Sequence, residues 1–497
     1  MFRASIVGCC IVLLLAATGG NALARSYPDA DKIVVIGNLG GDTDQMEQLL
    51  RATGVTNPEG DWAGGSLALV GTGDMVGSPL SAEMRRRMQA LSDQAQAANG
   101  AAVWLLGEQE IQAMGASEAE GREWLMQRPV VATVGDLALV HGGLSKSLAN
   151  GSLEQANQAF RQRAATGDLS IGADPVGYQG TRGCHPFGES GRVASALQNL
   201  GASMAVIGHP SDRQPEAVSR FQGRVLQMGG QPSALLLQDG VIRQLALDGS
   251  ELEITSPPPR NWSYPNGMSD ADVEHFLATA PVVKTEDVGS GITNPKRLTL
   301  SDGTTTMRAV FKYYDSDPGL EKSFSYRREH NSSDRFQYEV AAYRIDRLMN
   351  LQLIPAAVIR RVGTDEGAVQ YWVEDTFNEN DRRDEEIKYT GICNLRSQYD
   401  VMDAFDVLIY NNDRNQSNIL YTSDWQVFLI DHTRAFSSRG GRPKMLARTR
   451  FKLQPMMARA LTELSDQALQ REMQGLLHKR QILGLQKRRD ELLKLLP

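Results

Sequence analysis

Two short segments in the second half of the chain combine carboxylates and an amide at a spacing that could support phosphotransfer chemistry. The first is the loop 412–420, Asn-Asp-Arg-Asn-Gln-Ser-Asn-Ile-Leu, in which Asn418 follows Asp413 by five residues. The second is the apolar run 427–430, which ends at Asp431. One aspartate in such a layout can orient or deprotonate an acceptor hydroxyl, and an asparagine and a second aspartate can hold Mg²⁺ against phosphates. We therefore assign the acid–base role to Asp413 and the Mg²⁺ ligands to Asn418 and Asp431.

A lysine and a glutamate upstream are of the types that such a site requires. Lys312 ends the apolar run 309–311, and Glu339 lies in a predicted helix over 336–349. A lysine on the third strand that pairs with a glutamate on the next helix can neutralise nucleotide phosphates. Taken alone, each residue is more often a solvated surface charge, and only the order of the motifs favours a joint role for them.

Two further segments fit the same arrangement. Gly289 and Gly291 flank Ser290 just before the first predicted strand of this half, where a flexible loop could cover phosphates. A short Gly/Ser loop is weak evidence by itself. The apolar segment 371–373, followed by Glu374 and Asp375, is a candidate hinge strand beside a nucleotide base.

Together these motifs resemble those of an atypical kinase over about residues 284–490. Their order is more similar to phosphoinositide kinases, bacterial toxin-type serine kinases and secretory-pathway kinases than to ordinary protein kinases. The resemblance implies a two-lobed α+β kinase-like domain that binds ATP with Mg²⁺ or Mn²⁺ and phosphorylates an unknown protein or small-molecule acceptor. Asp431 is followed by His432 and Thr433, where protein kinases have Phe-Gly. No Walker-A motif is present, which excludes a P-loop NTPase.

The first half carries a second series of motifs, each placed directly after a short apolar run. They are Gly37-Asn38-Leu39-Gly40-Gly41-Asp42, Gly73-Asp74-Met75-Val76-Gly77, Gly107-Glu108-Gln109-Glu110, His141-Gly142-Gly143 and Gly208-His209-Pro210. This series resembles a calcineurin-like metallophosphoesterase of the bacterial serine/threonine-phosphatase type over most of 31–246. The resemblance implies an α/β sandwich with two metal ions held by loops at the strand ends.

Several metal ligands of that family are replaced in this chain. The replaced positions are Asn38, Gly40 and Gln109. The retained candidates for one divalent metal are Asp74, His141 and His209, with Glu108 as a further donor. A two-metal site neutralises phosphate and deprotonates a bridging water, so the loss of ligands predicts little phosphatase activity. Two alternatives stay open: a phosphoesterase that uses one retained metal, and a binding protein without catalysis in either half.

The elements that must position these residues follow from periodicity and turn signals. In the first half, strands are expected at 32–37, 66–70, 102–106, 137–140 and 204–207, helices at 43–51 and 81–98, and a closing hairpin at 223–246. In the second half, a hairpin is expected around the turn 301–303, and helices are expected from about 445 onward. Strands followed by helices favour an α+β domain, whereas the alternation in the first half favours an α/β domain.

The termini of these two domains are marked by a targeting segment and a linker. Residues 1–24 have Arg3, an apolar run and Ala22-Leu23-Ala24, which is typical of a cleaved signal peptide. Three consecutive prolines at 257–259 predict an extended linker over 256–269. The domains are therefore expected at 25–255 and 270–497, in an exported, periplasmic or secreted protein without a membrane-spanning domain after signal cleavage.

Composition excludes several classes of protein. The 497 residues are 41% hydrophobic and 22% charged, which is ordinary for a globular chain and excludes a disordered or polytopic membrane protein. A net charge of −7 supplies no general basic field, so nucleic acid is not an expected partner. After signal cleavage only Cys184 and Cys393 remain, on opposite sides of the linker, and we interpret them as separate buried thiols.

Overall fold

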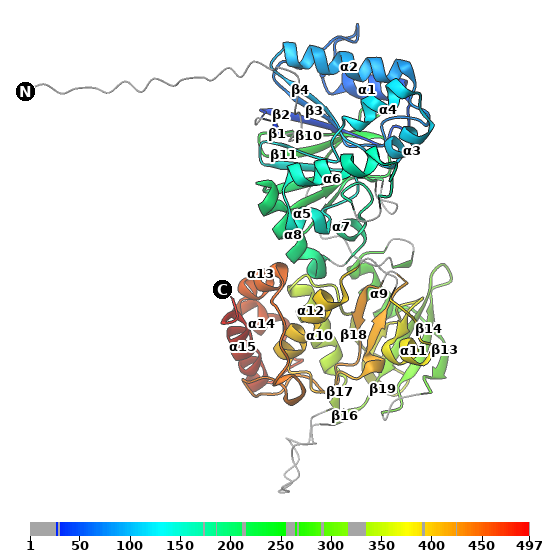
Figure 1. The fold of residues 1–497 in the computed structure, drawn as a ribbon. Coiled ribbons are helices and arrows are strands. Elements are labelled where there is room, and N and C mark those ends of the chain that lie inside the picture. Colours follow the sequence, from blue (N-terminus) through cyan, green and yellow to red (C-terminus); the bar gives the residue numbers. More distant parts are fainter. Residues whose placement is uncertain are drawn as a thin grey trace, which may run out of the picture.

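The chain folds into two halves, which lie one above the other in Figure 1. The computed structural model describes residues 26–27, 30–171, 174–184, 186–210, 215–254, 264–265, 268–289, 293–316, 334–389, 393–423 and 425–496. The signal segment, most of the proline-rich linker and Gly291 lie outside the described residues. Within the described residues, no helix combines the length and the apolar composition that a membrane crossing requires.

The first half contains two six-stranded sheets. One sheet has the order β1 (Ser26–Tyr27), β5 (Val131–Val134), β6 (Leu137–Val140), β7 (Met204–Ile207), β9 (Val225–Gln227) and β8 (Val218–Arg220). The other has the order β12 (Glu251–Glu253), β11 (Val241–Ala246), β10 (Ser233–Gln238), β2 (Lys32–Ile36), β3 (Ala68–Gly71) and β4 (Ala101–Trp104). The pairs β2–β3, β3–β4, β6–β7 and β7–β9 are parallel.

Alternate side chains of the strands enter two different cores, as the period of two in a strand requires. Val35 of β2 and Leu139 of β6 belong to one apolar cluster, which is shared by the two sheets. Val34 and Ile36 of β2 face the other way, into the cluster that includes Met46 of the first helix. The sheets therefore form a sandwich whose outer faces are covered by helices (Figure 1).

The helices of this half connect the strands, and the candidate motifs begin where the strands end. They are α1 (Thr43–Ala52), α2 (Ala82–Ala97), α3 (Glu108–Ala116), α4 (Ala119–Met126), α5 (Lys146–Asn150), α6 (Leu153–Ala165), α7 (Gly180–Gly183) and α8 (Pro186–Leu200). Because β2, β3 and β4 are parallel, the loops after them emerge at one edge of the sheet. This places Asn38, Asp74 and Glu108 at the same edge.

One predicted pairing in this half is wrong. The expected closing hairpin over 223–246 included β9, but β9 pairs with β7 and β8 in the other sheet. Only β10 and β11 form the hairpin, through the turn at Asp239 and Gly240. β9 and β10 are both short and apolar, so their sequences do not specify which of the two sheets each strand joins.

The second half begins with a five-stranded antiparallel sheet in the order β13 (Val282–Asp287), β14 (Lys296–Ser301), β15 (Thr306–Lys312), β19 (Asp365–Tyr371) and β18 (Ala357–Val362). The hairpin of β14 and β15 forms around the predicted turn. Helices α9 (Asp270–Thr279) and α10 (Gln337–Leu348) pack against β18 and β19. Tyr371 and Trp372 then lead out of this lobe toward the helical part.

The remaining part of this half is mainly helical. It contains α11 (Glu379–Asp384), α12 (Leu395–Ile409), α13 (Pro455–Glu463), α14 (Asp466–Glu472), α15 (Lys479–Leu493) and the short 3₁₀ helices η2 (Gln416–Asn418) and η3 (Lys444–Leu446). A small sheet has the order β20 (Phe377–Asn378), β21 (Ile419–Tyr421) and β22 (Val427–Leu429), and β16 (Asp315–Ser316) pairs with β17 (Asp334–Arg335). This small sheet carries the loop of Asp413 and the strand that leads to Asp431.

The two halves are docked through α8, which reaches from the first half onto α12 and α13 (Figure 1). A Cβ added at Gly188 of α8 would lie 2.8 Å from Cγ of Gln398 on α12, so only glycine allows this close approach. The side-chain amide of Gln426, just before β22, donates to the carbonyl oxygen of Gly183. The interface therefore connects the first half directly with the base of the candidate kinase site.

A disulfide bond between Cys184 and Cys393 crosses this interface, with the two Cα atoms 5.2 Å apart. The interpretation of these cysteines as separate buried thiols is therefore wrong, although both residues are buried. The two cysteines lie 209 positions apart in the sequence, so no local pattern indicated their pairing. Docking of α8 against the second half brings them together, which is a property of the tertiary structure alone.

Candidate functional site

Lys312, Glu339 and Asp431 meet at the centre of the second half. Nζ of Lys312 lies 2.5 Å from Oε1 of Glu339 and 2.8 Å from Oδ1 of Asp431. Lys312 is the last residue of β15, and Glu339 is the third residue of α10. Asp431 follows the end of β22 by two residues. The structure thus brings together three residues that lie up to 119 positions apart in the chain.

The electrostatics of this cluster keep all three residues charged. Burial opposes the charge of Lys312, but the carboxylates of Asp431 and Glu339 outweigh it and raise the pKa of the lysine. Burial likewise opposes ionisation of Glu339 and Asp431, yet the charge of Lys312 lowers the pKa of each carboxyl. The ammonium group of Lys312 is therefore held between two carboxylates, and Asp431 is the more exposed of the two acidic residues.

Asp413 and Asn418 lie on the loop between α12 and β21. Oδ2 of Asp413 is 2.9 Å from Nη1 of Arg434, and Nε of the same arginine donates to Oδ2 of Asp334 at 2.9 Å. Nδ2 of Asn418 donates to the backbone carbonyl of Asp413 at 3.3 Å. Arg434 therefore holds one oxygen of the Asp413 carboxylate, and sequence reasoning did not assign it this role.

The environment of Asp413 favours a carboxylate that can accept a proton. Burial and the nearby Asp431 raise the pKa of Asp413, whereas Arg434 opposes this effect. A general base works best when its pKa is raised toward the operating pH. The direction of the shift is thus the one that the acid–base role requires.

Two buried residues that sequence reasoning did not assign connect the loop with the cluster. Arg414 forms a bidentate ion pair with Asp406, with both contacts at 2.9 Å. It also donates to the carbonyl oxygens of Asn418 at 3.1 Å and Ile430 at 2.7 Å. His432 lies between Arg414 and Glu339 and is fully buried. The only sequence signal was a histidine at a position where protein kinases have phenylalanine.

The donor set at this site suits a hard divalent cation. Asp431 and Asn418 offer a carboxylate and an amide oxygen, which are ligands that Mg²⁺ prefers. Gly289 adopts φ +78°, a conformation that favours glycine, and a Cβ added there would have no atom within 4 Å. Gly291 lies outside the described residues, so the predicted phosphate-covering role of the pair stays a prediction.

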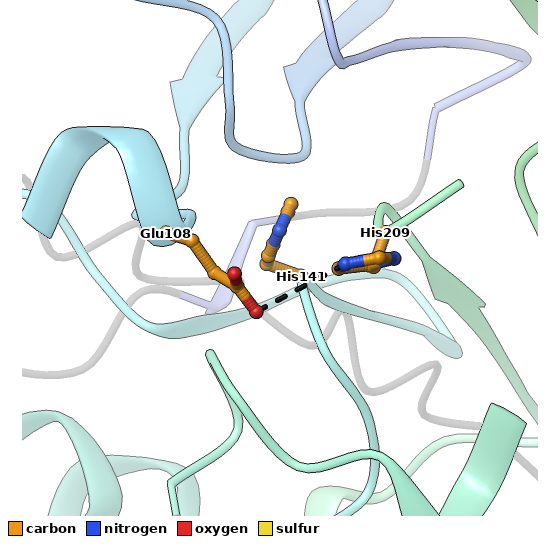
Figure 2. Close-up of side chains that lie close together, drawn as sticks. All are labelled: Glu108, His141 and His209. Carbon is orange, nitrogen blue, oxygen red and sulfur yellow. Dashed lines mark ion pairs between the residues drawn. The ribbon is translucent and has the colours of Figure 1, made fainter. Parts of the chain in front are cut away.

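The candidate metal residues of the first half also converge (Figure 2). One ligand atom from each of Glu108, His141 and His209 lies within 4.8 Å of the others. Nε2 of His141 is 3.4 Å from Oδ2 of Asp74, so the fourth candidate lies at the same place. These four residues come from the loops after β3, β4, β6 and β7, as expected for motifs at strand ends.

Several features of this cluster fit a divalent cation. Nδ1 of His141 lies 2.9 Å from the carbonyl oxygen of Thr72, which can only accept, so Nδ1 carries a proton and Nε2, which makes no hydrogen bond to the described residues, is the ring nitrogen that could bind a cation. Oδ1 of Asn38 is buried and makes no hydrogen bond to the described residues. A bound divalent ion would satisfy both atoms, and it would supply Lewis-acid polarisation of a phosphoryl oxygen.

Other features of the same cluster oppose a normal two-metal site. Nη1 of Arg182 lies 2.8 Å from Nδ1 of His209, and Nη2 lies 3.9 Å from Oε1 of Glu108. A guanidinium thus stands among the ligands, and burial together with this arginine lowers the pKa of His209. Gly40 adopts φ +57°, which a histidine would adopt only with strain. A histidine placed at position 40 would therefore be strained in this loop.

One part of the second half matches a known protein family. A family model described as phosphatidylinositol 3- and 4-kinase matches residues 365–478. This segment runs from β19 to the start of α15 and includes Asp413, Asn418 and Asp431. No curated protein matches the chain in sequence.

Three solved structures are similar over about half of the chain. The cold-active protein-tyrosine phosphatase of a psychrophile Shewanella species has 20% identity and a TM-score of 0.40, and the match covers 47% of this chain and 84% of that one. The structure of hydra Fam20 with sugar has 14% identity and a TM-score of 0.36, and the match covers 45% of this chain and 88% of that one. The Golgi casein kinase with Mn/ADP bound has 16% identity and a TM-score of 0.34, and the match covers 47% of this chain and 76% of that one. At TM-scores below 0.5, these similarities carry no argument about activity.

The family match supports a kinase-like phosphotransferase domain in the second half. It leaves the N-terminal lobe with Lys312 and Glu339 outside the matched residues, and their place in the site rests on the ion pairs described above. The phosphatase-like character of the first half rests on its motifs and on the convergence of their retained ligands.

Proposed function

We propose that this protein is an exported, atypical kinase-like phosphotransferase that binds Mg²⁺·ATP and carries a largely inactive phosphatase-like domain. The observation that carries the proposal is the ion-paired cluster of Lys312, Glu339 and Asp431 next to the loop of Asp413 and Asn418. The family match over 365–478 supports the same conclusion for the part of the site that it covers.

Each residue of the site has a distinct task in this proposal. Lys312 neutralises the α- and β-phosphates of the nucleotide and is held by Glu339. Asp431 and Asn418 hold Mg²⁺, which offsets the negative charge of the phosphates when it is bound. Asp413 accepts or orients the proton of the acceptor hydroxyl, while Arg434 fixes the direction of its carboxylate. The acceptor is a protein or a small molecule with a hydroxyl group.

The proposal is tested by titration calorimetry of the chain that begins at Arg25 with ATP, in the presence and absence of Mg²⁺. We expect binding that requires the divalent ion, together with slow formation of ADP or a phosphorylated product. Absence of nucleotide binding under both conditions would leave the binding-protein alternative in its place.

The first half is proposed to act as a docking or regulatory domain rather than as a phosphatase. Arg182 occupies the space between Glu108 and His209, and Asn38 and Gly40 have replaced two ligand types. The residues that would hold a single metal are Asp74, His141, His209 and Glu108. The alternative of a one-metal phosphoesterase would require Arg182 to leave this position.

Export is supported by the signal-like N-terminus and by the disulfide bond, because disulfides persist mainly in oxidising compartments. Exported protein is therefore expected to begin at Arg25 and to contain no free thiol. A protease site placed within 256–260 gives a direct test of the covalent link between the halves. After cleavage, the two fragments should migrate together on a denaturing gel without reductant and separate with it.

The matched control for this experiment is Cys393→Ser, which should let the fragments separate without reductant. If fragments of the wild-type chain already separate without reductant, the disulfide bond is absent from the protein.

A further inference from the structure

We propose that His432 is a positioning residue that joins the Lys312–Glu339 pair to the Arg414–Asp406 pair and so fixes the nucleotide-binding residues of both lobes relative to one another. This inference rests on the proposed kinase function and adds a device that holds its site in one arrangement. The residue follows Asp431 directly and is fully buried.

The contacts of His432 with Glu339 involve both its backbone and its ring. The backbone N–H of His432 donates to Oε1 of Glu339 at 2.9 Å, and Nδ1 lies 3.3 Å from Oε2 of the same carboxylate. Lys312, which belongs to the N-terminal lobe like Glu339, contacts the same Oε1. The histidine therefore holds the carboxylate that in turn holds the lysine.

The contact with Arg414 decides which tautomer the ring adopts. Nη2 of Arg414 lies 2.9 Å from Nε2 of His432, and a guanidinium can only donate. Nε2 must therefore accept, and the proton of the neutral ring must lie on Nδ1, where it points to Oε2 of Glu339. Both ring nitrogens are thus used, one as an acceptor and one as a donor, without the ring becoming charged.

Arg414 extends this connection to the proposed metal ligands. Nε and Nη2 of Arg414 donate to the carboxylate of Asp406, and Nη1 donates to the carbonyl oxygens of Asn418 and Ile430. Ile430 directly precedes Asp431, and Asn418 is itself a proposed ligand. Glu339 of the N-terminal lobe is therefore connected through His432 and Arg414 to the backbone on both sides of the metal site.

A phenylalanine at this position would fill the same space without either contact. Oε2 of Glu339 would lose its ring donor, and Nη2 of Arg414 would lose an acceptor, in a buried region where unsatisfied polar groups are destabilising. Glu339 would then be held through Oε1 alone, by Lys312 and by the backbone N–H of residue 432, and its second oxygen would no longer be fixed. The substitution of the usual phenylalanine by histidine thus exchanges an apolar contact for a polar connection between the lobes.

The first test compares Mg²⁺·ATP affinity in His432→Phe and His432→Asn, with His275→Phe on the exposed face of α9 as the matched control. We expect His432→Phe to weaken affinity about tenfold or more, the usual scale for a residue that orients a ligand-binding group. The amide of His432→Asn can replace Nδ1 as a donor to Glu339 and should restore most of the affinity. If Phe and Asn behave alike, or if neither differs from the control, the proposal is wrong.

Should His432→Phe fail to fold, the comparison is made between His432→Asn and His432→Gln. The shorter amide reaches Glu339, whereas the longer one reaches Arg414. The proposal expects the higher nucleotide affinity in His432→Asn, because this contact acts on Lys312 directly. Equal affinities in the two variants would overturn it.

The second test does not depend on kinase function. A double-mutant cycle of His432→Leu, which removes the ring donor, and Glu339→Gln is measured by urea unfolding of the whole chain. Residues in one hydrogen-bonded network are expected to deviate from additivity by about fivefold or more in the unfolding equilibrium constant. Additivity within about twofold would show that His432 does not act through Glu339. If the wild-type chain binds no nucleotide, the proposed function fails, and this cycle still decides the role of His432.

Discussion

Replacing Asp413 by asparagine is expected to lower phosphotransfer turnover by about 10²-fold or more while Mg²⁺·ATP affinity stays within about threefold of wild type. An amide has the same shape as the carboxylate but cannot take a proton from the acceptor hydroxyl. Asp413 does not contact Lys312, and Arg434 holds its side chain from the other side. Turnover and nucleotide affinity are therefore separable at this residue, and both are measured in the same preparation.

The matched control is Asp365→Asn, an exposed aspartate at the turn between β18 and β19 that takes no part in the site. It should leave both quantities unchanged. If Asp413→Asn instead weakens nucleotide binding as much as it lowers turnover, Asp413 belongs to the metal or phosphate site and not to the acid–base step.

Replacing Asp431 by asparagine is expected to weaken both Mg²⁺·ATP binding and turnover. The substitution removes a charged metal ligand, which should lower affinity for the metal-bound nucleotide by about 10–100-fold and turnover by about 10²–10³-fold. It also removes one of the two carboxylates that raise the pKa of Lys312. The lysine stays protonated through Glu339, so the main loss is in metal binding.

Titrating Mg²⁺ at fixed ATP measures this loss, because a weakened metal site should need a higher metal concentration for half-saturation. Affinity for ATP without a divalent ion should change little in Asp431→Asn. If both Asp413→Asn and Asp431→Asn leave nucleotide binding and phosphotransfer unchanged, the kinase proposal fails and the protein is a binding protein.

The candidate site contains residues that could be identified from the sequence and residues that could not. Asp413, Asn418 and Asp431 stand out because their spacing and the apolar run before Asp431 are local features of one short stretch. Lys312 and Glu339 needed the added assumption that a strand and a helix pack together, and the ion pairs in the structure supply that packing. Arg434 carried no pattern, and the only signal at His432 was its position directly after Asp431, because the roles of both residues depend on what lies across from them.

The first half shows the same division. The periodicity of 32–37 and 43–51 predicted a strand and a helix that the structure contains as β2 and α1. The spacing of the motifs does not predict that Arg182 lies among the metal ligands. It depends on how α7 folds back over the strand ends, which involves residues distant in the chain.

The sequence by itself determined the local features of this protein: the strand and helix periodicity, the turns and the order of the chemical motifs. Each of these depends on neighbouring residues, so the backbone preferences and the burial of alternate side chains are visible within a short window. Tertiary structure alone decided the sheet that β9 joins, the Cys184–Cys393 bond and the connection from Glu339 through His432 to Arg414. These features join segments that lie 18 to 209 positions apart, and their stability comes from docking between surfaces whose complementarity no short window of sequence contains.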